Sequence, residues 1–281
     1  MINQKGKLRA SAPILLTFFI LAVVFYWLGY WLIFRLERAT PLMMSVGLAA
    51  VVSCLIHGRP LASLGLLWGK SRFQWASFLI PLATVSLSYL IIWGLGLAQF
   101  NLDFIESLRG TYNLADWNGF SIILFHVALS ATFTLCLAVP SILGEEIAWR
   151  GLLVGELSKS LSFGSVALIS GLLWSVFHWP LMMKGFYGSE FTPFVFQLAI
   201  FTLFIVSSSV TMTYLRYKTN SVWTAVLFHA SSNIFIQKVF TPLTVVDESS
   251  SWYVDEFGVV VPLLTFLVAL YFWTKAKREF A

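Results

Sequence analysis

Residues 119–157 read GFSIILFHVALSATFTLCLAVPSILGEEIAWRGLLVGEL, and they decide the class of fold. The stretch is apolar almost throughout and contains no Asp, Glu, Lys or Arg before Glu145. A helix needs roughly 20 apolar residues to cross a bilayer, because in hydrocarbon every backbone polar group must be bonded within its own helix. We therefore predict a membrane-spanning helix here, longer than one crossing requires.

The rest of the chain has the same character. Hydrophobic residues make up 58% of the 281 residues and charged residues 11%, far below the roughly 25% charged residues of a soluble domain. We predict an all-α, polytopic membrane protein with about eight transmembrane helices in one bundle. Neither a linker nor an internal repeat is visible, so residues 1–281 are expected to form a single transmembrane domain. The expected spans are 11–34, 40–56, 73–98, 119–157, 161–183, 194–215, 220–240 and 257–274.

The distribution of charge predicts the orientation of the bundle. Eight spans put both termini on one side, where segments carry thirteen Lys and Arg residues against five on the other side. Because basic residues gather in cytoplasmic loops, we predict a multi-pass protein of the cell inner (cytoplasmic) membrane with both termini cytoplasmic. The first apolar run is too long for a signal-peptide core, so we expect a retained helix. The basic residues lie in short loops rather than one stripe, and no nucleic-acid partner is expected.

Small residues give further expectations about packing. Cys54 and Cys136 lie in apolar runs without a metal-binding spacing, and both are interpreted as small core residues. Gly151 and Gly155 form a small-x-x-x-small pair, and residues 207–209 are all Ser. We predict close helix contacts at both places.

Polar residues inside the spans are costly in lipid and are therefore the first candidates for function. They form three groups at helical spacing: Glu145, Glu146 and Arg150; Trp174 and His178; His229 and Asn233. All three groups can meet near mid-depth if the helices are ordinarily tilted. Adjacent carboxylates differ by about 100° in direction on a helix. We predict that Glu146 pairs with Arg150 while Glu145 points into a mid-membrane active-site cavity; the opposite assignment stays open.

A site of this composition is suited to peptide hydrolysis. A carboxylate with a nearby histidine can deprotonate water for attack on a carbonyl carbon, and a second histidine with an asparagine amide can donate hydrogen bonds to the developing oxyanion. That chemistry requires no cofactor. Alternatively, Glu145, His178 and His229 form the ligand set of a catalytic zinc with one position open for water. The chain has no H-E-x-x-H helix, so a conventional zincin is not indicated.

At these residues the chain resembles the CAAX protease and bacteriocin-processing (CPBP or Abi) family of intramembrane endopeptidases, which includes the Ras-converting CAAX endopeptidases. The family's E-E-x-x-x-R, F-x-x-x-H and H-x-x-x-N motifs correspond, in order, to Glu145–Arg150, to Trp174 with His178, and to His229 with Asn233. The resemblance covers residues 120–240, the expected catalytic core.

The resemblance implies roles for these residues and a class of substrate. Glu145 would activate water with help from His178, while His229 and Asn233 would stabilise the oxyanion. Glu146 and Arg150 would support them, and Trp174 would serve in packing. Family members have been described both as metalloproteases and as metal-free glutamate proteases. The implied partner is a membrane-associated, prenylated or leader-bearing polypeptide.

Non-catalytic alternatives remain open from the sequence. The polar residues could be a buried ion pair and interhelical hydrogen bonds, a transporter or a proton relay, or the remains of a bacteriocin-immunity scaffold that kept the family's fold. The absence of a repeat and of paired broken helices speaks against a transporter. All four polar positions of the resemblance are intact, which speaks against degeneration.

Overall fold

The computed structural model describes residues 4–36 and 39–280 and consists of helices joined by short loops. Within these ranges the extended structure is one isolated bridge between Phe100 and Thr244, so the predicted all-α class is confirmed. The α-helices are α1 (Gln4–Leu36), α2 (Thr40–Ile56), α3 (Ser71–Gly94), α4 (Leu102–Thr111), α5 (Gly119–Leu129), α6 (Leu135–Glu146), α7 (Val154–Leu157), α8 (Phe163–Met183), α9 (Phe194–Thr219), α10 (Trp223–Ile234) and α11 (Val260–Glu279).

Three π-helical turns interrupt the longer runs. They are η2 (Ser130–Thr134) between α5 and α6, η3 (Ile147–Leu153) between α6 and α7, and η4 (Phe235–Phe240) after α10. Such turns are rare and often occur at functional sites. Here η3 begins directly after the two adjacent glutamates, and η4 begins two residues after Asn233. Two short 3₁₀ turns, η1 (Leu61–Leu64) and η5 (Ser250–Trp252), lie in loops.

Helix ends follow the local sequence. Asn118 caps α5 by accepting a hydrogen bond from the Ser121 amide, and Ser162 caps α8 by accepting one from the Ser165 amide. At the C-terminal end of α9, Asn220 adopts the left-handed conformation with φ 53° and ends the helix. These signals fix where the chain reverses between helices that carry the polar residues.

Six helical runs are long and apolar enough to cross a membrane, so the protein is multi-pass. These runs are Ala10–Leu36, Ser71–Gly94, Gly119–Leu157, Phe163–Met183, Phe194–Thr219 and Val260–Glu279. The predicted count of about eight is not confirmed. Helix α2 has 17 residues, which is short for a full crossing, and α10 has 12 residues before the π-turn η4 changes its pitch.

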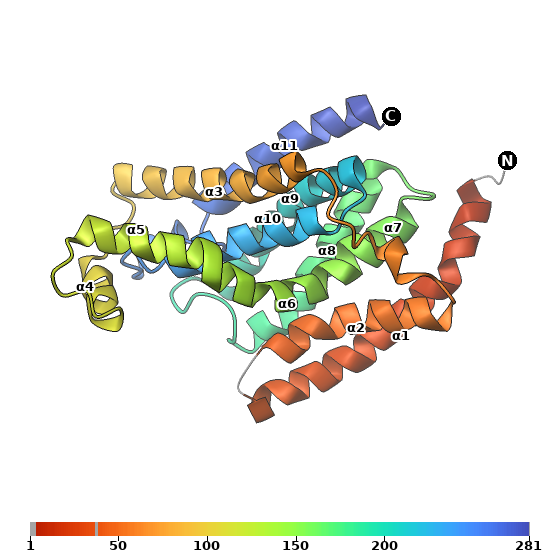
Figure 1. The fold of residues 1–281 in the computed structure, drawn as a ribbon, viewed down its shortest axis with the longest axis horizontal. Helices are drawn as coiled ribbons and strands as arrows, with labels where there is room; N and C mark the ends of the chain where they lie inside the picture. Colours follow the sequence, from red (N-terminus) through yellow and green to blue (C-terminus); the bar gives the residue numbers. More distant parts are fainter. Residues whose placement is uncertain (1–3, 37–38, 281) are drawn as a thin grey trace.

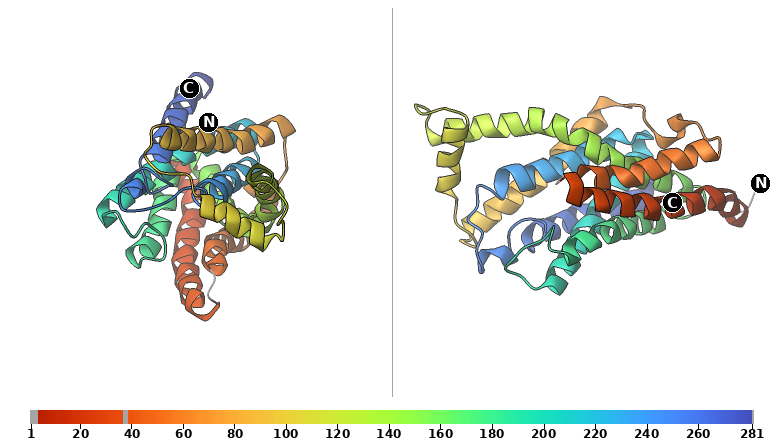
Figure 2. Two further views of the ribbon diagram at one scale, coloured as in Figure 1. Left: turned by 90° about the vertical axis from the view of Figure 1, so that its left-hand side faces the viewer. Right: turned by 90° about the horizontal axis from the view of Figure 1, so that it is seen from below.

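The helices run back and forth between two ends of the bundle. Both chain ends lie toward the right of Figure 1, while the short helix α4 lies at the opposite end. The two views of Figure 2 agree with this arrangement and show α1 and α2 as a tilted hairpin against the rest. Helix α6 packs between that hairpin and α10, so the motif helices α6, α8 and α10 are all near the middle of the bundle.

The closest helix approach involves glycines other than the predicted pair. A Cβ on Gly47 of α2 would lie 2.1 Å from the carbonyl oxygen of Gly144 in α6, so the two backbones nearly touch. Of the predicted pair, Gly151 is in close contact, because a Cβ there would lie 3.2 Å from the Leu64 oxygen. A Cβ on Gly155 would meet nothing within 4 Å, and the predicted contact at that residue is wrong. The contact predicted at residues 207–209 is confirmed, because Ser209 packs against Gly171 and donates a hydrogen bond to Ala167.

The two cysteines differ in environment. Cys54 is fully buried, as predicted, but Cys136 is exposed on the surface of α6. The interpretation of Cys136 as a core residue is therefore wrong. An apolar run that spans a membrane is apolar on its lipid-facing side too, so the run alone cannot distinguish a core position from a lipid-facing one.

Candidate active site

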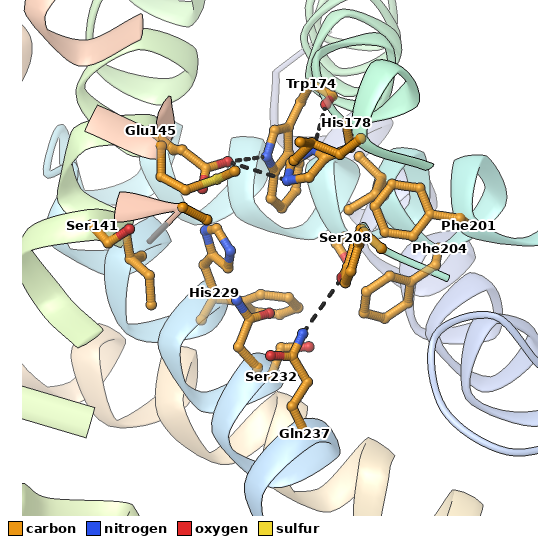
Figure 3. A pocket seen from close by; sticks show the side chains of 18 of the residues that line it. Ser141, Glu145, Trp174, His178, Phe201, Phe204, Ser208, His229, Ser232 and Gln237 are labelled. Carbon is orange, nitrogen blue, oxygen red and sulfur yellow. Dashed lines mark hydrogen bonds and ion pairs between the residues drawn. The ribbon is translucent and has the colours of Figure 1, made fainter. Parts of the chain in front are cut away.

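Glu145 points into a cavity and is held there by a tryptophan. The indole Nε1 of Trp174 donates a hydrogen bond of 2.7 Å to Glu145 Oε2, and both side chains are buried. His178, one turn further along α8, brings its Nε2 to 3.8 Å from the same oxygen. Figure 3 shows these three side chains converging from α6 and α8. Trp174 is therefore more than the packing residue that the sequence suggested, because a phenylalanine could not make this hydrogen bond.

The orientation of the His178 ring follows from its second nitrogen. Its Nδ1 lies 3.0 Å from the backbone oxygen of Trp174. A carbonyl oxygen can only accept, so Nδ1 carries the hydrogen and donates it. Nε2 is thus the nitrogen left to exchange a proton or to hydrogen-bond with a water molecule beside Glu145.

Glu146 points away from the cavity, into closed protein. Arg150 Nη1 donates hydrogen bonds of 3.1 and 3.0 Å to the two Glu146 oxygens, and both side chains are completely buried. The guanidinium also lies 4.3 Å from the centre of the Trp174 ring, a cation–π contact. Adjacent residues of a helix point in different directions, so one of the two neighbouring carboxylates lies in the cavity and the other in a buried ion pair.

His229 joins the ion pair to the cavity. Its Nδ1 lies 3.0 Å from Glu146 Oε1, and because a carboxylate accepts, Nδ1 donates. Its ring is 5.0 Å from that of Trp174, centre to centre. The other ring nitrogen is left for the cavity that His229 lines. Glu146 thus orients His229 in addition to neutralising Arg150.

The four side chains predicted as catalytic line one cavity of about 240 Å³. Glu145 comes from α6, His178 from α8, and His229 with Asn233 from α10. This volume holds several water molecules. Trp174 also lines the cavity, whereas Glu146 and Arg150 lie behind its wall. The opposite wall is aromatic and includes Phe201 and Phe204 of α9 (Figure 3). Ile205 of the same helix also lines the cavity.

Sequence reasoning missed a polar cluster at the outer part of the cavity. Tyr187 and Gln237 line it, and both donate to Oε1 of the buried Glu256, at 2.7 and 2.8 Å. Burial and the Glu256 carboxylate raise the pKa of Tyr187 well above its usual range, so the phenol keeps its hydrogen. Tyr187 and Glu256 lie in loops 184–193 and 241–259, far apart in sequence, and no spacing signal could have linked them.

The arrangement does not provide a ready set of metal ligands. In the described parts of the chain, no three His, Cys, Asp or Glu side chains come together as they would around an ion. Glu145 and His178 approach each other, while His229 bonds to Glu146 through Nδ1 and keeps Nε2 for the cavity. Because three ligands in the described ranges do not converge on one point, we derive no step through a metal.

Ionisable side chains that line a cavity inside a bundle of membrane-spanning helices are the arrangement expected of an intramembrane functional site. Residues 121–235 match the family model of type II CAAX prenyl endopeptidase Rce1-like proteins. The matched segment contains Glu145, His178, His229 and Asn233, and the resemblance drawn from the sequence is confirmed. Through this segment the chain is similar to the CAAX-type intramembrane endopeptidases. No curated protein matches the chain.

Proposed function

We propose that the protein hydrolyses a peptide bond inside the membrane with Glu145 as the group that activates water. The observation that carries this proposal is the position of the Glu145 carboxylate, which faces the cavity beside His178 Nε2 and is fixed by Trp174. Glu145 Oε2 and His178 Nε2 are 3.8 Å apart, so one water molecule in the cavity can hydrogen-bond to both atoms. General base catalysis needs such direct contact with the water.

The reaction would proceed as follows. Glu145 accepts a proton from the water as its oxygen attacks the carbonyl carbon, and the carbonyl oxygen becomes an oxyanion. The carbon–nitrogen bond then breaks, and Glu145, with His178, returns the proton to the leaving amine. The products are a new carboxylate and a new amine, so one water is consumed per bond cleaved.

His229 and Asn233 would stabilise the oxyanion. Glu146 accepts a hydrogen bond of 3.0 Å from His229 Nδ1 and so fixes the ring, and Nε2 would donate to the oxyanion when it also carries a hydrogen. Asn233 lies one helical turn further along α10 and lines the same cavity, so its amide can supply a second donor. Glu146 and Arg150 then act through His229 as positioning residues.

The substrate would be a membrane-associated polypeptide with apolar side chains at the cleavage site, prenylated or leader-bearing. The aromatic wall that includes Phe201 and Phe204 of α9 supports this expectation, because it offers apolar surface across the cavity from Glu145 and His229. We place the enzyme in the cell inner membrane.

A cleavage assay on the purified protein tests the proposal. The probe is a quenched fluorescent CAAX-type peptide, farnesylated in one preparation and unmodified in another. We expect cleavage by the wild type, and loss of roughly 10²–10⁴-fold in rate for Glu145→Gln. Glu190→Gln, at an exposed carboxylate in the α8–α9 loop, is the matched control and should cleave normally.

Two outcomes would overturn parts of the proposal. Cleavage of neither peptide by the wild type would reject a CAAX-type substrate. Activity that is lost on chelation and recovered with zinc would favour the metal mechanism over the metal-free one, because metal affinity would then be part of the reaction.

A further inference from the structure

The mouth of the active-site cavity lies at one particular end of the bundle. Its rim is formed by Ala39, at the junction of α1 and α2, and by Phe186 in the α8–α9 loop, both exposed. Both junctions lie at the helix ends opposite to the two chain termini (Figure 1). None of the cavity-lining residues belongs to loops 57–70, 158–162 or 220–222, which join helices at the terminal end.

The terminal end of the bundle is closed beneath the cavity. The fully buried Glu146–Arg150 pair lies behind Glu145, and Arg216 Nε donates a hydrogen bond of 3.0 Å to the Arg150 backbone oxygen. A Cβ on Gly65 would lie 2.8 Å from Arg216 Nη2, so the loop 57–70 is pressed directly onto this arginine. The Val222 amide also bonds to the Gly65 oxygen at 2.8 Å, which ties the loop to the α9–α10 turn. A peptide therefore has no path to Glu145 from this end.

The two ends differ strongly in charge. Arg150 and Arg216 are buried and belong to the closed floor. Without them, and counting only side chains that the structure describes, the terminal end carries eight basic and two acidic residues, and the mouth end four basic and eight acidic residues. Basic residues are retained on the cytoplasmic side of a membrane protein. The charge distribution thus places the closed floor in the cytoplasmic half and the mouth on the other side.

We propose that substrates reach the site from the non-cytoplasmic side of the membrane. The substrate class is then the outer portion of a membrane-anchored or exported polypeptide, taken as an extended apolar segment. That the entering molecule is a substrate rests on the proposed function. The direction of access is inferred only from the closed floor, the position of the rim and the charge difference between the two ends. A prenylated polypeptide would therefore also have to reach Glu145 from the non-cytoplasmic side, since from the cytoplasm it would meet the closed floor.

Cysteine labelling tests the direction of access without any substrate. In a background with Cys54→Ala and Cys136→Ser, single cysteines are placed at the rim (Phe186→Cys), inside the cavity (Ser232→Cys) and on the closed end (Ser158→Cys). Ser158 is exposed in the α7–α8 loop and serves as the matched control for Phe186. The probe is the membrane-impermeant cation trimethylammonium-ethyl methanethiosulfonate, applied to bacterial spheroplasts and to inverted membrane vesicles.

We expect the rim and cavity cysteines to react in spheroplasts and the Ser158→Cys variant to react in inverted vesicles. The opposite pattern for Phe186→Cys and Ser158→Cys would overturn the orientation. A Ser232→Cys variant that reacts only in inverted vesicles, or in neither preparation, would overturn the open mouth. A variant that fails to reach the membrane is replaced by Tyr187→Cys at the rim or Ser208→Cys in the cavity, which are read in the same way. A protein that labels as expected but cleaves no peptide would leave access intact and count against the proposed function alone.

Discussion

The two carboxylates Glu145 and Glu146 are neighbours in the chain but belong to two different regions of the molecule. Glu145 borders a cavity that holds several water molecules and is held by one neutral donor, Trp174. Glu146 lies in closed protein, where Arg150 and His229 both donate to it. A carboxylate that must gain and lose a proton needs water and few fixed partners, whereas a carboxylate that neutralises an arginine needs full burial of both. The change in direction between adjacent residues of a helix places the two glutamates of the motif in these two different environments.

The largest expected effect comes from breaking the closed region. Arg150→Leu leaves the Glu146 carboxylate buried without its main counter-charge, a fault that costs about 3–5 kcal/mol of unfolding free energy. The melting temperature in detergent measures it. The double variant Glu146→Gln with Arg150→Met removes both charges and should regain much of the stability, but not the activity, because His229 loses its carboxylate. A single variant as stable as the wild type would contradict a structural role for the pair.

A smaller effect is expected from loosening Glu145 in its cavity. Trp174→Phe keeps the ring against Arg150 and His229 but removes the donor to Glu145. A hydrogen bond to a charged group contributes about 1.5–3 kcal/mol, and we expect cleavage to fall by about 10- to 100-fold. Trp179→Phe is the control, since its Nε1 bonds to Ser175 Oγ at 3.0 Å, away from Glu145. Equal rates for both variants would show that the Trp174 donor does not matter.

The smallest effect concerns the outer part of the cavity. Gln237 donates its amide nitrogen to Glu256, which leaves its oxygen as the acceptor for a bound peptide N–H. Gln237→Ala should raise KM several-fold and leave kcat unchanged, as expected for one lost hydrogen bond of about 1 kcal/mol. Gln197→Ala is the control, because that amide bonds to the backbone of Ser189 and Thr192 outside the cavity. A fall in kcat instead would place Gln237 in the chemistry.

Local rules predicted much of this molecule from its sequence. Hydropathy located the long spans, and four-residue helical spacing predicted the contact between Glu146 and Arg150, because both depend on neighbours along one helix. The π-turn after Glu146 did not disturb that contact. The two short helices α2 and α10 were harder to judge, since a length of 12 to 17 residues lies at the limit of a crossing.

Contacts between distant segments could not be predicted in the same way. The bond between His229 and Glu146 joins residues 83 apart, and Glu256 meets Tyr187 across 69. Trp174 was expected to pack, because its role was taken from a phenylalanine in the resemblance, and the indole donor has no counterpart there. Gly155 fitted a small-residue pattern but faces open space, whereas Gly47 and Gly144 make the close contact without any such pattern between them.

The central claim is the division of labour between the adjacent carboxylates, and one paired measurement tests it directly. Glu145→Gln and Glu146→Gln are purified together with the wild type, and each is measured for melting temperature in detergent and for peptide cleavage. We expect Glu145→Gln to melt like the wild type and to cleave roughly 10²–10⁴-fold more slowly. Glu146→Gln should melt at a clearly lower temperature, because Arg150 loses its counter-charge. Cleavage at the wild-type rate by Glu145→Gln would contradict the account.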